Sequence, residues 1–396
     1  MSRSNLAKIK YFEEEFLRIK KEAGTHSPSM STLRKTFPDF KIKIDACFLS
    51  NPYATDLVME YLQKELIENG NLRDVLEHYP SQQNALCEEF SKALHVKSEN
   101  LFIGNGAIEI IQALMQQVVD KKVVVPIPTF SSYYEFAKQD SQVVYYALDQ
   151  QNDYKFNTNH FIDFIQNENP DTVILINPNN PNGAYLKLDE MRTILKALKD
   201  VKQIIIDESF IHFAYDDEAM ELIDSTPLFY EFNNVIVVKS LSKDFGVAGV
   251  RLGYALMKEE LVKGLLSKGY LWNLNGIAET ILKFFSQKQF QNRYEIIRKN
   301  YIIECQNFFK GLENIPGIYV YPSQANFALI KLPSYIPSSL FVAYLLYEYG
   351  IYVRTANDKI GLDGEYVRIA VRRAEENEQM LNAIGLVMEQ FLGELK

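Results

Sequence analysis

The stretch "VVKSLSKDFGVAGVRLG" (Val237 to Gly253) places a lysine between a serine and an acid, eight residues before an arginine. It follows a short β-branched run and contains three glycines. In this setting Lys243 could belong to a phosphate-binding loop, could be a surface charge, or could be a nucleophile. The surrounding segments of the chain decide among these alternatives.

Short β-branched runs recur along the chain, each bounded by proline, polar residues or glycine. They are "KKVVVPIP" (121–128), "DTVILINP" (171–178), "KQIIIDES" (202–209) and "NVIVVKS" (234–240). Such runs are typical of strands that are buried on both faces of a mainly parallel sheet. Between them, residues 131–140 and 188–200 carry apolar residues at helical spacing. This alternation predicts an α/β fold with a doubly wound layer.

The pattern changes near residue 290. Helical periodicity over 291–314 is followed by strand-like pieces at 317–322, 326–332 and 366–372. These predict a smaller α+β domain, packed with part of the N-terminal segment. We therefore expect an N-terminal helical extension and arm over residues 1–50, a large domain over 51–290 and a small C-terminal domain over 291–396.

Composition excludes several classes of protein. A formal net charge of -9 and a pI near 5.3 argue against nucleic acid and against an anionic membrane surface as partners. Residues 1–24 indicate a charged amphipathic helix rather than a signal peptide, and no segment is apolar enough to span a membrane. The three cysteines are far apart and the five histidines lack ligand spacing, so we expect no metal site. A cytoplasmic location is expected.

Polar side chains follow several of the predicted strands. In open α/β sheets, ligands bind beyond the carboxyl ends of the strands, and there the sequence places "NPNNPNG" (177–183), Asp207 and the turn that holds Lys243. A single acid in such a position could simply cap a turn, and a single lysine could be a solvated charge. Considered together, these groups could act on one ligand.

That ligand is predicted to be pyridoxal phosphate. The cofactor needs a carboxylate for its ring nitrogen, an amine for its aldehyde, and an arginine with hydroxyls and helix amides for its phosphate. Asp207 can supply the first and Lys243 the second. Ser240, Ser242 and Arg251 can supply the third.

The motifs also resemble a known family. "SLSKDFGVAGVRLG" resembles the lysine motif of fold-type I aminotransferases, and "NPNNPNG" with "DESF" (207–210) resembles that family's ring-binding motifs in the same order. The resemblance extends from about His26 to Asn377. It implies a pyridoxal phosphate enzyme of fold type I, with a large domain built on a mostly parallel sheet between helices and a smaller α+β domain.

The resemblance implies further contacts to the cofactor phosphate. "GNGAIEII" (104–111) resembles the phosphate-binding turn, in which the backbone amides of Gly106, Ala107 and Ile108 would open a helix. It is not a dinucleotide fingerprint, because Glu109 occupies the place of the third glycine. "HYPSQQNAL" (78–86) resembles the segment whose tyrosine, here Tyr79, reaches the phosphate of the neighbouring subunit. A homodimer with shared active sites is therefore implied.

Two more residues are implied at the cofactor ring. "PTFSSYYEF" (128–136) resembles the segment that stacks an aromatic side chain on the ring, and Tyr133 is the position that matches. The alternative for Tyr133 is an ordinary place in the core. Asn180 would donate a hydrogen bond to the ring hydroxyl.

Two arginines in the C-terminal domain are candidates for binding the substrate. Arg354 and Arg368 both follow β-type runs, and Arg368 matches the arginine that grips a substrate carboxylate in the family. Two guanidinium groups and a histidine suit a phosphate dianion better than a single carboxylate. His26 lies where related enzymes place a substrate loop. Alternatively, one arginine, Arg354 more readily than Arg368, forms a structural ion pair.

Within the family, the resemblance is closest to the branch of histidinol-phosphate aminotransferases and threonine-phosphate decarboxylases. Phe210, the pair Trp272 and Asn275, and the stretch 361–381 favour the decarboxylase. Leu49 departs from the decarboxylase pattern, because it replaces an asparagine near the substrate. This change favours a different phosphorylated amino acid.

The sequence therefore predicts a decarboxylase of an O-phospho amino acid, with O-phospho-L-serine favoured over O-phospho-L-threonine and ethanolamine phosphate as the product. One alternative is an aminotransferase of the histidinol-phosphate type. Another is a catalytically idle binding protein, which the presence of Lys243 and Asp207 disfavours.

Overall fold

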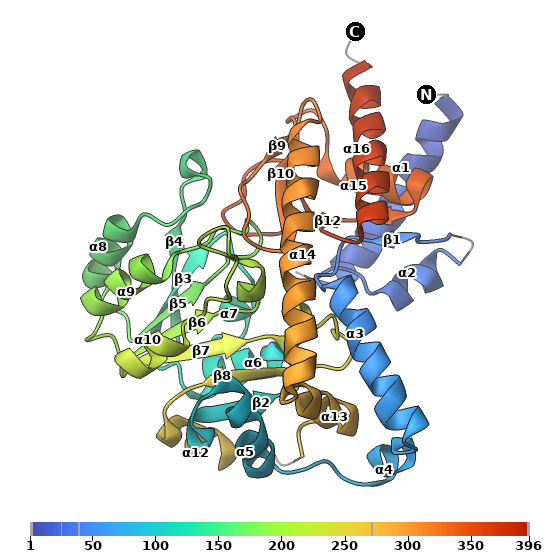
Figure 1. Ribbon diagram of the computed structural model, residues 1–396. Coiled ribbons are helices and arrows are strands. Elements are labelled where there is room, and N and C mark those ends of the chain that lie inside the picture. The colour runs from blue at the N-terminus through green and yellow to red at the C-terminus, as the bar shows by residue number, and fades with distance from the viewer. Residues whose placement is uncertain (1–2, 25, 39, 271, 394–396) are drawn as a thin grey trace. The chain divides into compact units, whose positions relative to one another are not determined.

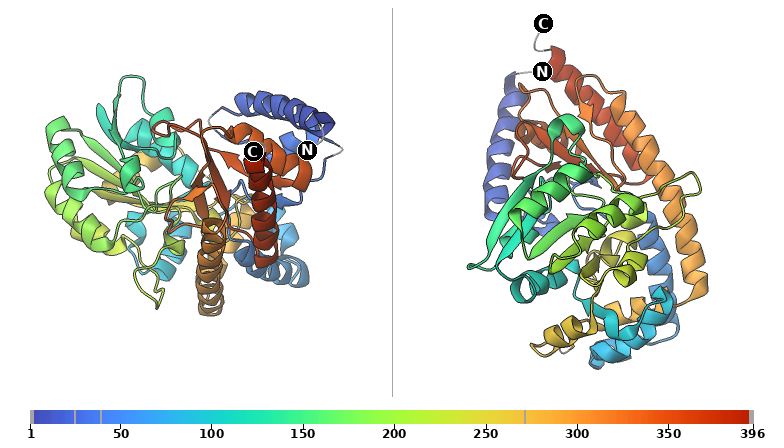
Figure 2. Two further views of the ribbon diagram at one scale, coloured as in Figure 1. Left: turned by 90° about the horizontal axis from the view of Figure 1, so that it is seen from above. Right: turned by 90° about the vertical axis from the view of Figure 1, so that its left-hand side faces the viewer.

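A computed structural model describes residues 3–24, 26–38, 40–270 and 272–393 of the chain. The chain forms two compact units, drawn together in Figures 1 and 2. Unit 1 comprises residues 1–49, 181–183 and 303–396, and unit 2 comprises residues 50–180 and 184–302. By this division the N-terminal segment belongs to the same unit as the C-terminal part of the chain. The boundary near the C-terminal part falls inside a long helix, α14 (Lys288–Glu313), beyond the expected change at residue 290.

Unit 2 is built on a seven-stranded sheet with the order β2-β8-β7-β6-β5-β3-β4. Strands β3 to β7 run parallel to one another, and only β8 is antiparallel to its two neighbours, β2 and β7. The strands are β2 (Leu101–Gly104), β3 (Lys122–Ile127), β4 (Gln142–Ala147), β5 (Thr172–Ile176), β6 (Gln203–Asp207), β7 (Val235–Lys239) and β8 (Gly253–Leu256). The mainly parallel α/β sheet predicted from the four β-branched runs is confirmed.

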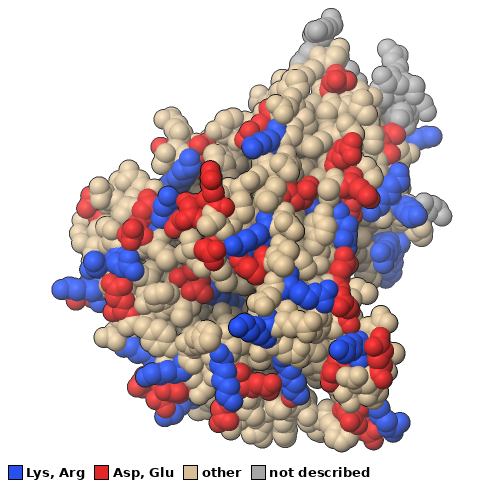
Figure 3. Space-filling view, viewed as in Figure 1, with Lys and Arg blue, Asp and Glu red and all other residues tan. Residues whose placement is uncertain are grey.

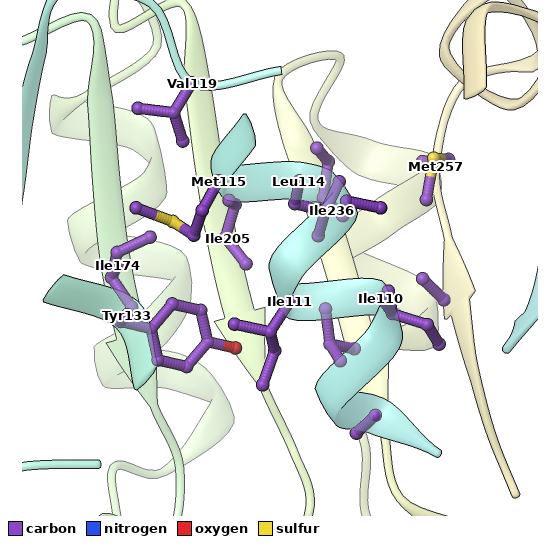
Figure 4. Close-up of a cluster of buried hydrophobic side chains, with 14 of the residues drawn as sticks. Ile110, Ile111, Leu114, Met115, Val119, Tyr133, Ile174, Ile205, Ile236 and Met257 are labelled. Atoms are coloured by element: carbon purple, nitrogen blue, oxygen red, sulfur yellow. The ribbon is translucent and has the colours of Figure 1, made fainter. Parts of the chain in front are cut away.

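Helices connect and cover these strands. Their bounds are α3 (Pro52–Leu62), α4 (Leu72–Glu77), α5 (Gln83–Leu94), α6 (Ala107–Gln117), α7 (Ser132–Glu135), α8 (Thr158–Glu168), α9 (Leu188–Ala197), α10 (Thr226–Glu231), α11 (Leu241–Asp244), α12 (Glu259–Leu266) and α13 (Gly276–Phe285). Figure 4 shows α6 lying across one face of the sheet, where Ile110, Ile111 and Leu114 pack among buried strand residues such as Ile205 and Ile236. This packing fixes the start of α6 against the ends of the central strands.

The predicted helix over 131–140 is shorter in the structure, where α7 ends at Glu135. The chain that follows is held by side-chain hydrogen bonds with the segment around the end of α6. Gln116 donates to the carbonyl of Phe136 at 2.7 Å, and Lys138 donates to the carbonyl of Val119 at 2.6 Å. These tertiary contacts replace the helical bonds that the apolar spacing suggested.

Unit 1 contains a four-stranded antiparallel sheet with the order β12-β13-β10-β9 and a parallel pair, β1-β11. The strands are β1 (Ile44–Asp45), β9 (Tyr319–Val320), β10 (Phe327–Lys331), β11 (Ile351–Tyr352), β12 (Arg354–Thr355) and β13 (Tyr366–Ala370). The helices are α1 (Arg3–Glu22), α2 (Met30–Thr36), α15 (Ser338–Tyr344), η5 (Leu345–Tyr349) and α16 (Ala374–Gly393). The parallel pair joins the N-terminal segment to the C-terminal part by backbone hydrogen bonds.

Two surface properties bear on possible partners. No helix among the described residues is long and apolar enough to cross a membrane. On the face seen in Figure 3, basic and acidic side chains are interspersed. That distribution lacks the single-sign field that a nucleic-acid-binding face presents.

Candidate active site

Asp207 ends strand β6 and is 3% exposed. One carboxylate oxygen accepts a 2.8 Å hydrogen bond from the hydroxyl of Tyr133, and the other accepts a 2.8 Å bond from the backbone amide of Ser209. Burial raises the pKa of Asp207, while these donors act in the opposite direction by stabilising its charged form. Tyr133 thus contacts Asp207 and belongs to the core at the same time.

Lys243 lies at the same edge of the sheet. Asp207 is opposite Val238 in the parallel pairing of β6 with β7, and β7 leads through Ser240 into the short helix α11, which carries Lys243. The backbone carbonyl of Lys243 accepts a 3.1 Å bond from the amide of Asn51. Its side chain is half-buried between two residues that are almost fully buried, Ser242 and Asp244. The structure therefore brings the predicted carboxylate and the predicted amine to one rim.

The start of α6 forms a crowded turn beside this rim. A Cβ on Gly106 would lie 2.6 Å from Nη2 of Arg251, and a Cβ on Gly253 would lie 2.6 Å from the amide nitrogen of Ala107. Gly106 has a φ of 80°, and Arg251 has a φ of 62°, which is rare for a residue with a side chain. The guanidinium of Arg251 therefore lies directly against the Gly106 backbone.

Helix N-terminal amides lack partners within the helix, so the turn at Ala107 and Ile108 presents donors to an anion. Glu109, in the first turn of α6, accepts bonds from the amide of Asn105 at 2.7 Å and from the side chain of Asn273 at 2.9 Å. These bonds hold the turn in shape. Amides and one guanidinium are the groups that bind a phosphate monoester.

The two serines of the lysine motif differ in their surroundings. Ser240 is the N-cap residue of α11 and is 5% exposed. The Ser242 hydroxyl donates to the carbonyl of Leu252 at 3.1 Å and accepts from the amide of Leu252 at 3.0 Å. In the structure Ser242 thus holds the chain next to Arg251, and its contact with a phosphate stays a prediction.

The asparagine-rich loop after β5 is held by its own side chains. Asn177 is bonded in both directions to the backbone of Leu186, and Asn179 is bonded to Thr129 and to the carbonyl of Pro128. The side chains of both asparagines therefore stabilise the conformation of this loop. Asn180 lies between these anchored segments and is 6% exposed.

A buried ionic network lies behind the rim. Lys239 is 1% exposed, and its Nζ lies 2.8 Å from Asp224 and 3.2 Å from Glu208, which follows Asp207 in the chain. Burial opposes the charged form of Lys239, yet the two carboxylates raise its pKa well above the usual value. This network fixes the ends of β6 and β7, which carry Asp207 and lead to Lys243.

His212 and Asp244 extend this buried region. The Nδ1 atom of His212 lies 2.8 Å from the hydroxyl of Tyr294 and 3.5 Å from a carboxylate oxygen of Asp244. Burial raises the pKa of Asp244 well above its usual value, and burial with the charges of Lys239 and Arg298 lowers the pKa of His212 well below its own. At neutral pH His212 is therefore uncharged.

Tyr79 is highly exposed, at 81%. Its ring packs on Trp272, with 5.1 Å between the ring centroids. Asn275, from the same motif as Trp272, caps α13 by accepting from the amide of Ala278 at 2.9 Å, and its side chain donates to the carbonyl of Val250 at 2.9 Å. Asn275 therefore supports the loop that carries Arg251.

The second set of predicted site residues lies in unit 1. Arg354 and Arg368 are Cα partners across the antiparallel pair β12-β13, and both are largely buried. Arg354 donates to the hydroxyl of Ser27 at 2.7 Å and to a carboxylate oxygen of Asp358 at 2.8 Å. Arg368 donates to the carbonyl of Cys47 at 2.9 Å. Burial and then the charge of Arg354 lower the pKa of Arg368 to about 9, so its guanidinium stays charged at neutral pH.

Three residues near these arginines were missed by the sequence analysis. The Ser27 hydroxyl accepts a bond from Arg354, while the adjacent His26 is exposed and its contact with a substrate stays a prediction. Asp358 lies four residues after Arg354 and forms an ion pair with it. Lys20, on α1, lies 3.6 Å from Asp358. No motif marks Lys20, because helix α1 shows only an amphipathic pattern.

Among the residues that the structure describes, no cluster of three His, Cys, Asp or Glu side chains could hold a metal ion. The Leu49 position, where the motif pattern departs from the decarboxylase, is an apolar side chain that is 3% exposed. Phe210, which follows Asp207 in the same motif, is also buried.

A fold-type I sheet with a lysine, a carboxylate and an anion-binding turn at one rim defines a class of protein. The chain belongs to the class I and II aminotransferase family, whose model matches residues 48–384. It is 55% identical over 378 residues to an L-serine phosphate decarboxylase of Sulfurospirillum multivorans, covering 96% of each chain. It is 53% identical over 366 residues to an L-serine phosphate decarboxylase of Campylobacter jejuni, covering 92% of this chain and 94% of the relative. A solved structure of a decarboxylase from Sulfurospirillum multivorans aligns with a TM-score of 0.93 at 55% identity, covering 97% of this chain and 98% of that one.

The family uses pyridoxal phosphate as its cofactor. The residues present fit this group, because the buried carboxylate of Asp207 suits a protonated ring nitrogen and the Gly106–Arg251 turn suits a phosphate. A Cβ at Gly106 would fill the place where the guanidinium meets the backbone. The primary amine of Lys243 is the group that reacts with an aldehyde.

Proposed function

We propose that the protein is a pyridoxal phosphate-dependent decarboxylase that converts O-phospho-L-serine to ethanolamine phosphate and carbon dioxide. The observation that carries this proposal is the cross-strand pair of Arg354 and Arg368, which places two guanidinium groups on one face of the sheet in unit 1. Such a pair suits the phosphate of the substrate better than a single carboxylate. The two relatives that are 55% and 53% identical to this chain are both L-serine phosphate decarboxylases, which supports the same substrate.

The choice of reaction depends on which substrate bond stands perpendicular to the cofactor ring. If both arginines hold the phosphate, with His26 nearby on the adjoining loop, the α-carboxylate is not clamped in the ring plane. The bond from the α-carbon to that carboxylate can then align for cleavage. Bound pyridoxal phosphate supplies an electron sink for the electron pair that this cleavage leaves behind.

The chain's own groups have the following proposed roles. Asp207, held by Tyr133 and the amide of Ser209, keeps a proton at the ring nitrogen. The primary amine of Lys243 would hold the cofactor aldehyde in the resting enzyme. Once the substrate has taken its place, the Nζ atom would gain a proton from the substrate ammonium group and donate a proton to the α-carbon in place of the departing carboxylate.

The remaining cofactor contacts are proposed in the same way. The ring of Tyr133 would lie against the cofactor ring, and Asn180 would donate to the ring hydroxyl. The phosphate would be held by the backbone amides of Gly106, Ala107 and Ile108 together with the side chains of Ser240, Ser242 and Arg251.

We also infer a homodimer in which Tyr79 of one subunit reaches the cofactor phosphate of the other. The support is the 81% exposure of Tyr79, whose ring packs on the exposed side chain of Trp272 in unit 2. Sedimentation of the holoenzyme tests the dimer. Weaker cofactor binding by Tyr79→Phe, with the dimer retained, tests the shared contact.

The decisive assay incubates the holoenzyme with O-phospho-L-serine and no keto acid. Many turnovers of carbon dioxide release, with an equal amount of ethanolamine phosphate, are expected. A single turnover per site, with loss of the absorbance of the bound cofactor aldehyde and no carbon dioxide, would instead identify the histidinol-phosphate type of aminotransferase. O-phospho-L-threonine in parallel tests the side-chain preference.

A further inference from the structure

The N-terminal helix α1 is anchored to unit 1 by an apolar face. Ile9, Phe12, Phe16 and Ile19 recur at helical spacing and are at most 6% exposed. The ring of Phe12 stacks on Phe37, with 4.2 Å between centroids. Figure 1 shows α1 beside α15, and the two helices are in contact. The helix is therefore an integral part of unit 1 and not a detached extension.

Directly after this apolar face, Lys20 turns inward to the arginine pair. Its Nζ donates to the hydroxyl of Thr355, the residue after Arg354, and lies 3.6 Å from a carboxylate oxygen of Asp358. The other carboxylate oxygen of Asp358 accepts the 2.8 Å bond from Arg354. One carboxylate thus lies between a lysine of α1 and an arginine of β12.

The three side chains are largely shielded from solvent. Their exposed fractions are 13% for Lys20, 19% for Asp358 and 8% for Arg354. Burial and the neighbouring charge of Arg354 lower the pKa of Lys20, and Asp358 opposes this shift. Asp358 is the anion that Lys20 and Arg354 share, because burying two like charges together without one is unfavourable.

Resting on the proposed function, we propose that Lys20 is a positioning residue for the substrate phosphate. It neutralises Asp358 in part and fixes its orientation, so that Asp358 aligns Arg354 without cancelling its charge. Without Lys20, Asp358 pairs more fully with Arg354, and the positive potential available to a phosphate dianion falls. The helix that precedes the family's matched segment, which starts at residue 48, thereby sets the affinity for the phosphorylated substrate.

The test compares Lys20→Met and Lys20→Gln with the conservative Lys20→Arg in the holoenzyme. Lys21→Met is the matched control, because Lys21 is the next residue of the same helix and is exposed. The dissociation constant for inorganic phosphate is measured by calorimetry, alongside KM and kcat for O-phospho-L-serine. Both Lys20→Met and Lys20→Gln should raise the dissociation constant and KM about tenfold with kcat nearly unchanged, and Lys20→Arg should restore most of the affinity.

Asp358→Asn separates positioning from a direct charge effect. In that background, Lys20→Met should change phosphate affinity much less, because there is no carboxylate left to hold. An undiminished effect would overturn the proposal, as would a fall in kcat or cofactor affinity equal to the rise in KM, or the same loss in Lys21→Met.

The phosphate measurement does not depend on the reaction. If the wild-type enzyme releases no carbon dioxide from O-phospho-L-serine, the proposed function fails, while the binding data still decide the role of Lys20. Turnover by the wild type combined with an unchanged phosphate constant in the Lys20→Met and Lys20→Gln variants overturns only the inference about Lys20.

Discussion

Arg354 and Arg368 lie directly opposite each other in the antiparallel pair of β12 with β13. Directly opposed residues project from the same face of a sheet, with Cβ atoms about 5 Å apart. Like charges in this arrangement destabilise a sheet unless an anion compensates them. Asp358 compensates in part through its bond to Arg354.

Replacing Arg354 by lysine should weaken binding of the phosphate group, because lysine cannot present a planar fork of donors. We expect KM for O-phospho-L-serine to rise by about tenfold or more, with a smaller change in kcat. Steady-state kinetics and competition by inorganic phosphate measure this effect. Arg293→Lys is a suitable control, because Arg293 is paired to Glu60 at 2.6 Å on the surface of unit 2. A role of Arg354 in structure alone would lower the thermal midpoint and leave KM unchanged.

Replacing Tyr133 by phenylalanine should slow catalysis without unfolding the protein. The change removes the 2.8 Å donor to Asp207 inside a buried region, so the charged carboxylate becomes less stable and holds the ring proton less well. A fall of about 10- to 100-fold in kcat/KM is expected, from the loss of one hydrogen bond to a charged group. The pH dependence of the bound cofactor's absorbance reports on the ring proton, and Tyr134→Phe provides the comparison. Unchanged kinetics and absorbance would show that Asp207 does not need this donor.

Substitutions of two lysines four positions apart, Lys243 and Lys239, should affect different properties: the first should affect catalysis and the second should affect stability. Lys243→Ala should abolish turnover and the visible absorbance of the bound cofactor while the protein keeps its thermal midpoint. Lys239→Met should leave the buried carboxylate of Glu208 and the partly exposed carboxylate of Asp224 without their counter-ion, at a cost of about 3–5 kcal/mol in unfolding free energy. Thermal melts and activity assays separate the two outcomes. Lys263→Met, at an exposed pair with Glu259, should have little effect on either quantity.

His212 should make the fold less stable in mildly acidic solution. Its pKa is lowered well below 6.5 in the folded protein, first by burial and then by Lys239 and Arg298. As the pH falls below about 6.5, the unfolded chain takes up a proton that folded His212 refuses, so stability is full above this pH and is lost below it. The loss approaches about 1.4 kcal/mol per pH unit from this one group.

Thermal midpoints at pH 7.5 and 5.5 test this prediction against His212→Asn, in which the side-chain amide can still bond to Tyr294. The variant should lose less stability over this interval than the wild type. Because Asp224, Asp244 and Tyr294 also face this region, the comparison rests on the difference between the two proteins. Equal losses would mean that His212 does not titrate differently on unfolding.

Much of the fold and of the cofactor site could be predicted from the sequence. The β-branched runs became β3, β5, β6 and β7 because strands buried on both faces need continuous apolar residues, whatever surrounds them. Glycines 106 and 253 mark the anion-binding turn through local requirements, a positive φ and close backbone approach. The shortened α7 could not be predicted, because side chains of Gln116 and Lys138 outside it hold the chain that follows.

The order of the motifs along the chain determined by itself that this is a fold-type I enzyme with Asp207 and Lys243 at one rim, because parallel strands deliver their carboxyl ends to the same edge. Only the tertiary structure decided which residues surround the two arginines. Lys20, Ser27 and Asp358 come together there through helix packing and the pairing of β1 with β11. Contacts of such large sequence separation leave no periodic signal, since each depends on the docking of whole elements and not on local conformational preference.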